Sequence, residues 1–254
     1  MAKKPVVAMQ MYTFRTEAAA DYPGTLKRLA QMGWPAVQVS GIHSYKAKDI
    51  GKVMKDLGLG SAGTHVNFRK LETEFGAIVD IVKDLGTEWA IIPSRPDDWA
   101  PGAEGWRSFG KAMTEMGAKL KAVGLRLGYH NHAREFEKFD GETGYDIMYE
   151  AADASLVHNE LDTYWVQYGG CDPVAYIKKF AGHIQVMHFK DMGPGEKKPM
   201  VPIGTGILDW PKIIDACKAG GTEWICCEQD ETAPLETWEA ARQSLESCKK
   251  WHLV

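Results

Sequence analysis

Side chains that can bind a metal or move a proton recur at the ends of short apolar runs in this sequence. His130 and His132 follow one run, and Glu160 and Asp162 close another. Residues two apart along a strand point to the same face, so we expect each pair on one surface of a sheet. Imidazole together with carboxylate suits Mn²⁺, Zn²⁺, Co²⁺ or Fe²⁺ better than Ca²⁺, and both groups can serve as general bases.

Three more apolar runs end in residues of the same kinds. One leads into His65, the next contains His188 and is followed by Lys190, and the last is followed by Glu228 and Asp230. Several carboxylates gathered at one place would repel and desolvate one another, at a cost of several kcal/mol for each uncompensated charge. A divalent cation removes that penalty. We therefore predict a metal site wherever these strand ends meet.

Eight short apolar runs alternate with stretches of helical period. The runs are Pro5–Gln10, Ala36–Ser40, Leu59–Gly63, Trp89–Ile92, Leu125–His130, Leu156–Leu161, Ile184–His188 and Trp224–Cys227. Alternating strands and helices imply parallel strands with right-handed crossovers. Eight such units in 254 residues fit a closed (β/α)8 TIM barrel better than an open doubly wound sheet. We predict a single domain over residues 1–254, with the carboxyl ends of its strands at one mouth.

Composition narrows the classes of partner. The chain has 30 Lys and Arg against 34 Asp and Glu, a net charge of -4, which argues against a nucleic-acid binder. No apolar run approaches the roughly 18 residues of a membrane span. The five cysteines are odd in number and irregularly spaced, which favours reduced thiols in a cytosolic protein. We expect a cytoplasmic protein with neither nucleic-acid nor membrane partners.

One glycine motif is expected to be misleading. The segment from Gly58 to Gly63 matches the dinucleotide pattern G-x-G-x-x-G. That pattern binds phosphate only when it follows a strand and opens a helix, whereas here it follows a helix and leads into a strand. We interpret it as a helix C-cap followed by small residues at the start of a strand.

At the strand-end residues the chain resembles the sugar phosphate isomerase/epimerase family, the xylose isomerase-like TIM barrels. The resemblance covers nearly the whole chain. It is carried by Tyr12-Thr-Phe-Arg15, Gly128-Tyr-His-Asn-His132, Leu161-Asp-Thr-Tyr-Trp165, His188-Phe-Lys-Asp191, the segment from Pro202 to Trp210, and Glu228-Gln-Asp230. These motifs are specific to the superfamily but not to a substrate. The resemblance also suggests a homo-oligomer.

Members of that family hold one divalent metal with Glu, Asp, His and Glu from four strands. The last three match Asp162, His188 and Glu228, whereas the first falls on His130. This departure puts a two-glutamate epimerisation mechanism in doubt and leaves open whether His130 binds metal or acts as a base. The resemblance implies a metal shell of His130, Asp162, His188 and Glu228, with Mn²⁺ expected and Co²⁺, Zn²⁺, Fe²⁺ or Mg²⁺ as alternatives.

The chemistry implied is proton removal next to a carbonyl, through an enediolate, by a metal-dependent sugar isomerase or epimerase. Glu228, His132 and His130 are the expected catalytic residues. The expected substrate-binding residues are His65, Tyr12, Glu160, Lys190 and Trp165. No glycine-rich phosphate cradle is visible, so we expect an unphosphorylated sugar or keto sugar.

Three other functions remain open. The same metal site could serve a lyase that eliminates the aglycone from a 3-keto-glycoside. The chain could also be a non-catalytic barrel subunit, which would bind no metal. An endonuclease acting at abasic DNA sites is disfavoured by the net charge of -4.

Overall fold

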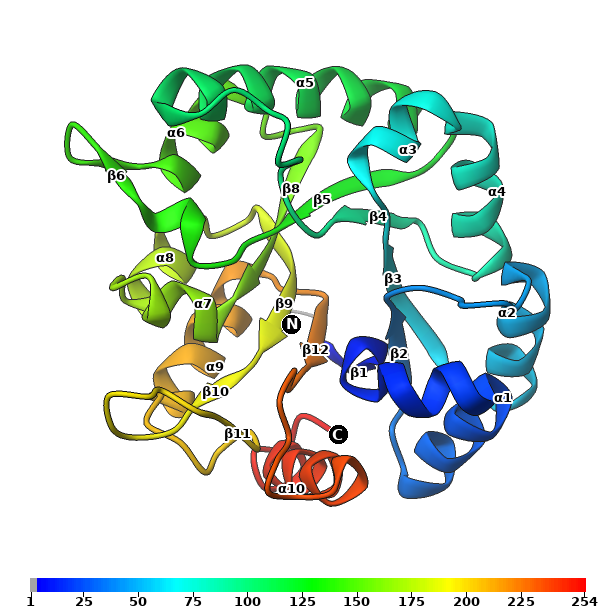
Figure 1. Ribbon diagram of the computed structural model, residues 1–254. Coiled ribbons are helices and arrows are strands. Elements are labelled where there is room, and N and C mark those ends of the chain that lie inside the picture. The colour runs from blue at the N-terminus through cyan, green and yellow to red at the C-terminus, as the bar shows by residue number, and fades with distance from the viewer. Residues whose placement is uncertain (1–3) are drawn as a thin grey trace.

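A closed barrel of eight parallel strands forms the centre of the molecule (Figure 1), as shown by a computed structural model that describes residues 4–254. Its strands are β1 (Val6–Gln10), β2 (Ala36–Val39), β3 (Gly60–His65), β4 (Trp89–Ile92), β5 (Arg126–His130), β8 (Val157–Asp162), β9 (Ile184–Phe189) and β12 (Trp224–Cys227). They neighbour one another in chain order, and β12 closes the barrel against β1. The predicted (β/α)8 barrel is confirmed, and each predicted apolar run overlaps one of its strands.

The third strand reaches further than the sequence predicts. The apolar run ends at Gly63, but β3 continues to His65. Gly63 has φ 132°, and the pairing of β2 with β3 shifts register beside it. A Cβ at Gly63 would lie 2.9 Å from Cδ1 of Ile91, so glycine is required twice over, for its backbone angle and for the close approach of β4. The irregularity carries His65 to the barrel mouth.

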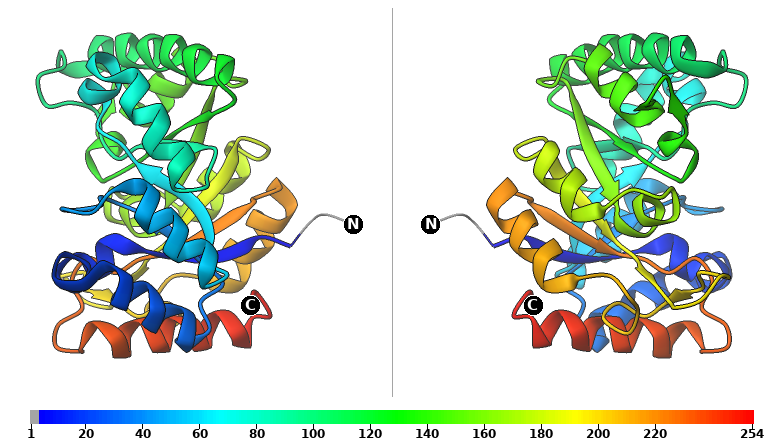
Figure 2. Two further views of the ribbon diagram at one scale, coloured as in Figure 1. Left: turned by 90° about the vertical axis from the view of Figure 1, so that its right-hand side faces the viewer. Right: turned by 90° about the vertical axis from the view of Figure 1, so that its left-hand side faces the viewer.

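Helices surround the barrel on all sides, with α5 and α10 on opposite flanks (Figure 2). They are α1 (Arg15–Met32), α2 (Ala47–Asp56), α3 (Phe68–Thr73), α4 (Phe75–Asp84), α5 (Gly102–Ala122), α6 (Gly144–Ala151), α7 (Thr163–Tyr168), α8 (Pro173–Lys179), α9 (Trp210–Gly220) and α10 (Thr237–Lys250). Short 3-10 turns cover Met11–Phe14 and Arg134–Phe136. The helices pack apolar stripes on the barrel; Leu26 and Leu29 of α1, for example, have no exposed surface.

The glycine pattern between α2 and β3 is confirmed as structural. Gly58 adopts φ 72° directly after α2, and Gly60 begins β3. The segment therefore ends a helix and starts a strand, and it does not form the strand-to-helix turn that cradles a phosphate.

Two long loops lie at the carboxyl ends of the strands. The loop after β4 runs to the start of α5 at Gly102. The loop after β9 contains a small hairpin, β10 (Asp191–Met192) with β11 (Met200–Val201). The buried carboxylate of Asp191 organises that loop, because its Oδ2 accepts hydrogen bonds from the backbone N–H of Gly204 at 2.9 Å and from Nε1 of Trp210 at 2.7 Å.

An apolar layer fills the barrel toward the amino ends of its strands. It consists of Ala8, Ala36, Ala62, Trp89, Ile91, Val186 and Cys226, all at most 1% exposed. Side chains two residues further along each strand point into the same interior, one layer nearer the mouth. That next layer is polar, and it contains the candidate site.

Candidate metal centre

Polar side chains follow the apolar layer on several barrel strands. Gln10 lies two residues beyond Ala8 and Gln38 two beyond Ala36, while His188 and Glu228 hold the corresponding places after Val186 and Cys226. Gln10, Gln38 and His188 have no exposed surface, and Glu228 is 6% exposed. The alternation of side chains along the strands therefore brings amides, an imidazole and a carboxylate into one enclosed space.

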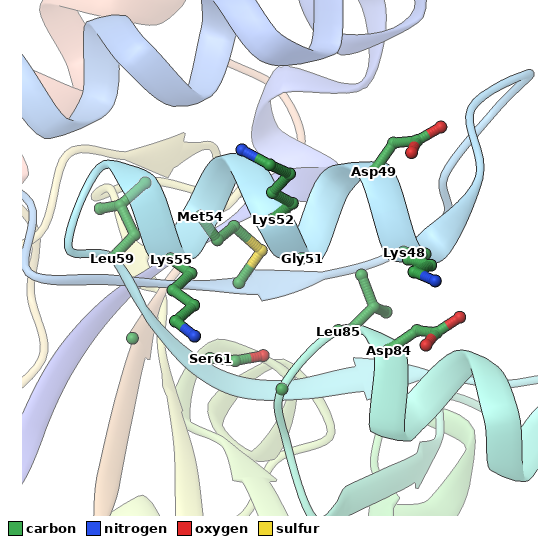
Figure 3. Close-up of a pocket in the computed structure, with 12 residues that line it drawn as sticks. Lys48, Asp49, Gly51, Lys52, Met54, Lys55, Leu59, Ser61, Asp84 and Leu85 are labelled. Carbon is green, nitrogen blue, oxygen red and sulfur yellow. The ribbon is translucent and has the colours of Figure 1, made fainter.

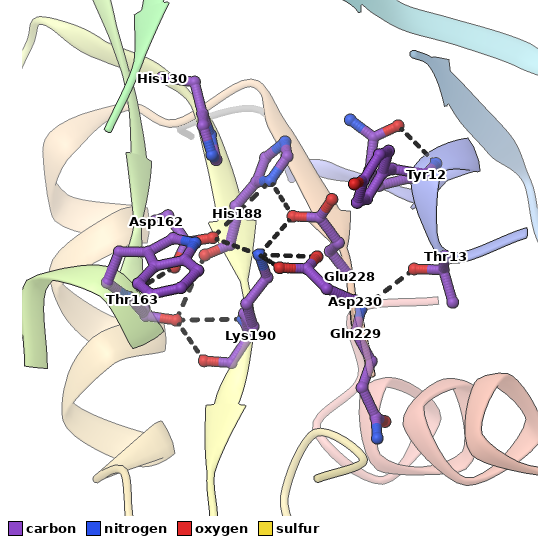
Figure 4. A network of polar contacts seen from close by, with 12 residues as sticks. Tyr12, Thr13, His130, Asp162, Thr163, His188, Lys190, Glu228, Gln229 and Asp230 are labelled. Atoms are coloured by element: carbon purple, nitrogen blue, oxygen red, sulfur yellow. Dashed lines mark hydrogen bonds and ion pairs between the residues drawn. The ribbon is translucent and has the colours of Figure 1, made fainter. Parts of the chain in front are cut away.

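The four residues predicted as the metal shell converge there (Figure 4). His130, Asp162, His188 and Glu228 are buried, and each offers a ligand atom within 4.8 Å of the other three. Nδ1 of His188 lies 2.9 Å from Oε2 of Glu228 and 3.9 Å from Oδ2 of Asp162. The four side chains come from the ends of β5, β8, β9 and β12, so barrel closure is what brings them together.

The orientation of Asp162 is fixed by the local backbone. Its Oδ1 accepts a hydrogen bond from the backbone N–H of Trp165 at 2.9 Å and so caps the N-terminus of α7. Its own backbone N–H donates to Oδ1 of Asn131 at 3.0 Å. Oδ2, the other carboxylate oxygen, is left facing the cluster.

Lys190 places a buried ammonium beside this cluster. Its Nζ lies 2.8 Å from Glu228 Oε2, 3.0 Å from Asp230 Oδ1 and 3.2 Å from Asp162 Oδ2, and the residue is 1% exposed. Burial alone would lower the pKa of Lys190, but the three carboxylates outweigh it and raise the pKa. Burial and the charge of Glu228 raise the pKa of Asp230 to about 7. Three acids thus share one fixed positive charge.

The donor set fits a divalent cation. Oδ2 of Asp162 is buried and accepts no hydrogen bond of suitable geometry, although the ammonium of Lys190 lies near it. Burial would lower the pKa of His188, but Glu160 and Glu228 outweigh it and raise the pKa well above its usual value. The carboxylates on the two sides of His188 therefore favour positive charge at this ring. Two imidazoles with two carboxylates match the preferences of Mn²⁺, Zn²⁺, Co²⁺ or Fe²⁺.

Another buried carboxylate, that of Glu160, lies on the other side of His188. Glu160 has no exposed surface, and its Oε2 lies 2.8 Å from Nε2 of His65 and 3.2 Å from Nε2 of His188. Its Oε1 accepts a short hydrogen bond from Nε2 of Gln38. Burial would raise the pKa of Glu160, but the neighbouring imidazoles of His188 and His65 outweigh it and lower the pKa well below its usual value.

A cavity of about 250 Å³ opens over these residues and is lined by two of the predicted metal ligands, His130 and Glu228. It is lined by Tyr12, His65, Pro93, Ser94, His130, His132, Lys190, Glu228 and Asp230. All three residues predicted to be catalytic line it, as do three of the five predicted to bind substrate. Tyr12, at 44% exposed, stands at its rim. Glu160 and Trp165 are not among the lining residues.

The placement of Glu160 and Trp165 has a physical reason in each case. Glu160 precedes Asp162 by two residues on β8, about 6.6 Å nearer the barrel interior, and is covered by imidazoles. Trp165 lies in α7, with its ring 5.3 Å from that of His132 and its face 5.4 Å from Nζ of Lys190. Both therefore contact residues of the cavity wall.

His132 is held against the cavity by a buried glutamate. Glu135 has no exposed surface, and its carboxylate accepts hydrogen bonds from the hydroxyl of Tyr129 at 2.6 Å and from the backbone N–H of His132 at 2.9 Å. Burial and the charge of Lys190 lower the pKa of His132 to about 4. His132 is therefore neutral near pH 7 and has a nitrogen free to accept a proton.

Another cavity, of about 600 Å³, lies beside α2 near the beginning of β3 (Figure 3). Lys52, Lys55 and Asp84 are among its lining residues. The apolar residues Met54, Leu59 and Leu85 also line it. It lies at the amino end of β3, and none of the four residues predicted as the metal shell lines it.

Comparison with known proteins shows which family the chain belongs to. Residues 26–251 match the sequence profile of the xylose isomerase-like TIM barrel family. The chain belongs to this family. The resemblance to sugar phosphate isomerases and epimerases is thereby confirmed.

Curated relatives of this family member include inosose dehydratases. That of Geobacillus kaustophilus is 24% identical over 189 residues, covering 66% of this chain and 61% of the relative. The rhizopine catabolism protein MocC of Rhizobium meliloti is 21% identical over 242 residues, covering 81% of this chain and 74% of that protein. The match spans less than two thirds of the inosose dehydratases, at 61% and 64% of their lengths.

Solved structures share the fold over essentially the whole chain. A sugar phosphate isomerase/epimerase from Parabacteroides distasonis superposes with a TM-score of 0.85 at 22% identity, covering 99% of this chain and 100% of that one. The IolI protein, solved with a bound zinc atom, gives a TM-score of 0.76 at 14% identity, covering 96% of this chain and 97% of that one.

Within residues 4–254, no helix combines the length and apolar character needed to cross a membrane. All five cysteines lie in this range, and each is a free thiol. The cytoplasmic location, the homo-oligomer and the single-domain organisation remain predictions.

Proposed function

We propose that this protein is a divalent-metal-dependent isomerase or epimerase that removes a proton next to the carbonyl of an unphosphorylated sugar or keto sugar. The observation that carries the proposal is the convergence of His130, Asp162, His188 and Glu228 beneath a polar cavity of about 250 Å³. Isomerase and epimerase neighbours with the same fold support it.

A cation held by these four residues would supply Lewis-acid polarisation of the substrate carbonyl and an adjacent hydroxyl. Glu228, Asp230, Lys190 and His132 all line the cavity. Glu228 follows β12 and His132 follows β5, strands three positions apart around the barrel. Two groups able to carry a proton therefore flank the substrate space, as required to remove a proton at one place and return it at another.

The roles of the remaining lining residues follow from their charge. Lys190 is held as an ammonium by three carboxylates, so it donates hydrogen bonds and can orient a substrate oxygen. His132 is neutral near pH 7 because its pKa is lowered to about 4, so one ring nitrogen keeps a lone pair toward the substrate, and the lowered pKa makes it a weaker base than an ordinary histidine. Glu228 is the carboxylate base at the cluster, and its pKa is well below the usual value because Lys190 and His188 outweigh the effect of burial.

The cavity is suited to an uncharged substrate. Lys190 is the one lysine or arginine among the lining residues, and its charge is already shared by Glu228, Asp230 and Asp162. A phosphate group would meet those carboxylates. Lys198, in the loop after β9, points elsewhere, with its Nζ 4.7 Å from the ring centre of Tyr168. We therefore infer an unphosphorylated polyol ketone or glycoside as the substrate.

A lyase is the second candidate, favoured by the curated relatives named as inosose dehydratases. The same proton abstraction, followed by loss of a group from the neighbouring carbon, gives elimination. Asp230, with its pKa raised to about 7, is placed to hand a proton to a leaving oxygen. The leaving group would be water from a cyclic ketone or the aglycone of a 3-keto-glycoside.

The proposal is tested by metal analysis followed by solvent-deuterium exchange. Protein loaded with Mn²⁺ or Zn²⁺ is incubated in D₂O with ketoses, inososes and 3-keto-glycosides, and products are followed by NMR and mass spectrometry. Deuterium incorporation with the atoms otherwise conserved supports isomerisation or epimerisation, whereas release of water or aglycone supports the lyase.

The control variants separate chemistry from general damage. Glu228→Gln should abolish exchange, whereas Glu231→Gln should not, because the Glu231 side chain is 79% exposed. A chain that binds no divalent cation and exchanges no substrate proton would refute the proposal and favour a non-catalytic barrel subunit.

A further inference from the structure

Glu160 occupies a place that the metal shell does not explain. It pairs with His130 across β5 and β8, and its Oε2 lies 3.2 Å from Nδ1 of His130 and 3.2 Å from Nε2 of His188. Two of the four proposed metal ligands therefore contact this one buried carboxylate. Glu160 contacts His188 at Nε2, whereas Asp162 and Glu228 lie near the other ring nitrogen, Nδ1.

The amide of Gln38 links Glu160 to His188 by a second path. An ionised carboxylate only accepts hydrogen bonds, so the amide nitrogen of Gln38 must face Glu160. The amide oxygen then faces Nε2 of His188, at 2.6 Å, and also accepts a hydrogen bond from Nε2 of Gln10. A flipped amide would place its oxygen against the carboxylate and its N–H groups against Gln10.

The tautomer of His188 follows from these contacts. Its Nε2 faces two acceptors, the Gln38 oxygen and the Glu160 carboxylate, so Nε2 carries the hydrogen. When a cation replaces one of the two ring hydrogens, the hydrogen on Nε2 stays with its two acceptors and the lone pair is on Nδ1. Nδ1 is the atom turned toward Glu228, at 2.9 Å, and toward Asp162, at 3.9 Å. The nitrogen able to bind a cation is thus directed at the two carboxylates of the shell.

We propose that Glu160, acting directly and through Gln38, is a positioning residue that fixes the ring and tautomer of His188 for cation binding. This inference rests on the proposed metal-dependent function. It also concerns the first metal-ligand position, where the family has a glutamate and this chain has His130. The Glu160 carboxylate lies beside His130 on the paired strand. A hydrogen-bonded carboxylate behind a ligating imidazole makes the ligand more basic and holds its orientation.

The test measures Zn²⁺ affinity, without substrate, for wild type, Glu160→Gln, Gln38→Met and the double variant, by chelator competition at one pH. Each single variant should bind Zn²⁺ about 10–100-fold more weakly. The double variant should be no weaker than the weaker single variant, because both residues act on the same nitrogen. In Zn²⁺-loaded wild type, imidazole ¹⁵N shifts should show His188 protonated on Nε2 and bound through Nδ1.

Glu135→Gln is the matched control, since Glu135 is an equally buried carboxylate that bonds to Tyr129 and to the backbone of His132 and to none of the four ligands. Its Zn²⁺ affinity should stay at the wild-type value. Thermal unfolding of each variant verifies that it is folded, and Gln38→Met tests the path independently if Glu160→Gln does not fold.

Three results would overturn the inference. Wild-type affinity in Glu160→Gln would show that the carboxylate does not act on the site. Losses that add in the double variant would show that Gln38 does not relay the effect. Two Zn²⁺ per wild-type chain but one in Glu160→Gln would make Glu160 a ligand of a second ion. In each of these cases wild type still binds metal, so the proposed function stands; if wild type binds none, both fall.

Discussion

Replacing Lys190 with methionine should destabilise the metal-free protein strongly. Lys190 is 1% exposed, and its ammonium lies 2.8–3.2 Å from carboxylate oxygens of Glu228, Asp230 and Asp162. Methionine fills similar space without charge, so three acids lose their shared cation. Removing one partner of a buried ion pair costs about 3–5 kcal/mol, because the other partner stays buried and uncompensated.

The loss should depend on pH and on metal in a defined direction. Asp230 has its pKa raised to about 7 in the wild type, and loss of the lysine raises it further. Protonation of Asp230 therefore relieves more of the repulsion at pH 6 than at pH 8, and the destabilisation should grow as pH rises. Zn²⁺ should recover part of it, because the cation neutralises the same carboxylates.

Urea unfolding with excess EDTA, then with Zn²⁺, measures these effects. The matched control is Lys212→Met, because Lys212 makes an ion pair with Asp209 at 2.7 Å while its side chain is 72% exposed. The control should unfold like the wild type, since exposed pairs are screened by solvent. If Lys190→Met unfolds at the wild-type urea concentration in EDTA at pH 8, the charge argument for this site is refuted.

Three further outcomes are expected. Asp162→Asn should keep the cap on α7, because asparagine caps equally well, yet lower Zn²⁺ affinity by more than the roughly 10–100-fold of an outer contact, as measured by chelator competition. The pKa of His158 is lowered to about 4 by burial and by Arg126, so its contribution to stability is present above pH 6.5 and lost toward pH 4; His158→Gln should flatten that part of the urea stability profile. Gly110→Ala should destabilise by about 1–3 kcal/mol, because its Cβ would lie 2.2 Å from a backbone oxygen of α6, whereas Gly76→Ala in α4 meets nothing within 4 Å and should stabilise by about 0.5–1 kcal/mol in thermal unfolding.

The barrel and the convergence of His130, Asp162, His188 and Glu228 could be predicted from the sequence because both follow from alternation along strands. The position of His130, Asp162 or His188 at or next to the end of an apolar run predicts which face of the strand its side chain is on. It also predicts that the residue lies at the carboxyl end of the strand. Once the barrel closes, those ends have to meet. Asp162 and His188 are indeed paired across β8 and β9.

How deep each polar side chain lies within the barrel could not be predicted from this alternation. Glu160 shares the face of Asp162, as predicted, but alternation does not say which of the two reaches the cavity and which is covered. Gln10 and Gln38 gave no chemical signal, since a lone glutamine in an apolar run is an ordinary strand residue. A polar residue two positions beyond a small apolar one on the same strand is the pattern that would have marked them.

The apolar layer beneath the polar one closes the amino end of the barrel, which leaves the mouth as the entrance to the cavity. Because Trp89, Ile91 and Val186 block the amino end of the barrel, metal and substrate share the entrance past Tyr12. An ion held by the proposed shell would lie deeper than the proposed substrate, so it would have to bind first, and a substrate above it would block its exit. Saturating substrate should therefore slow removal of the ion by a chelator, because a ligand in the upper cavity blocks dissociation of the metal.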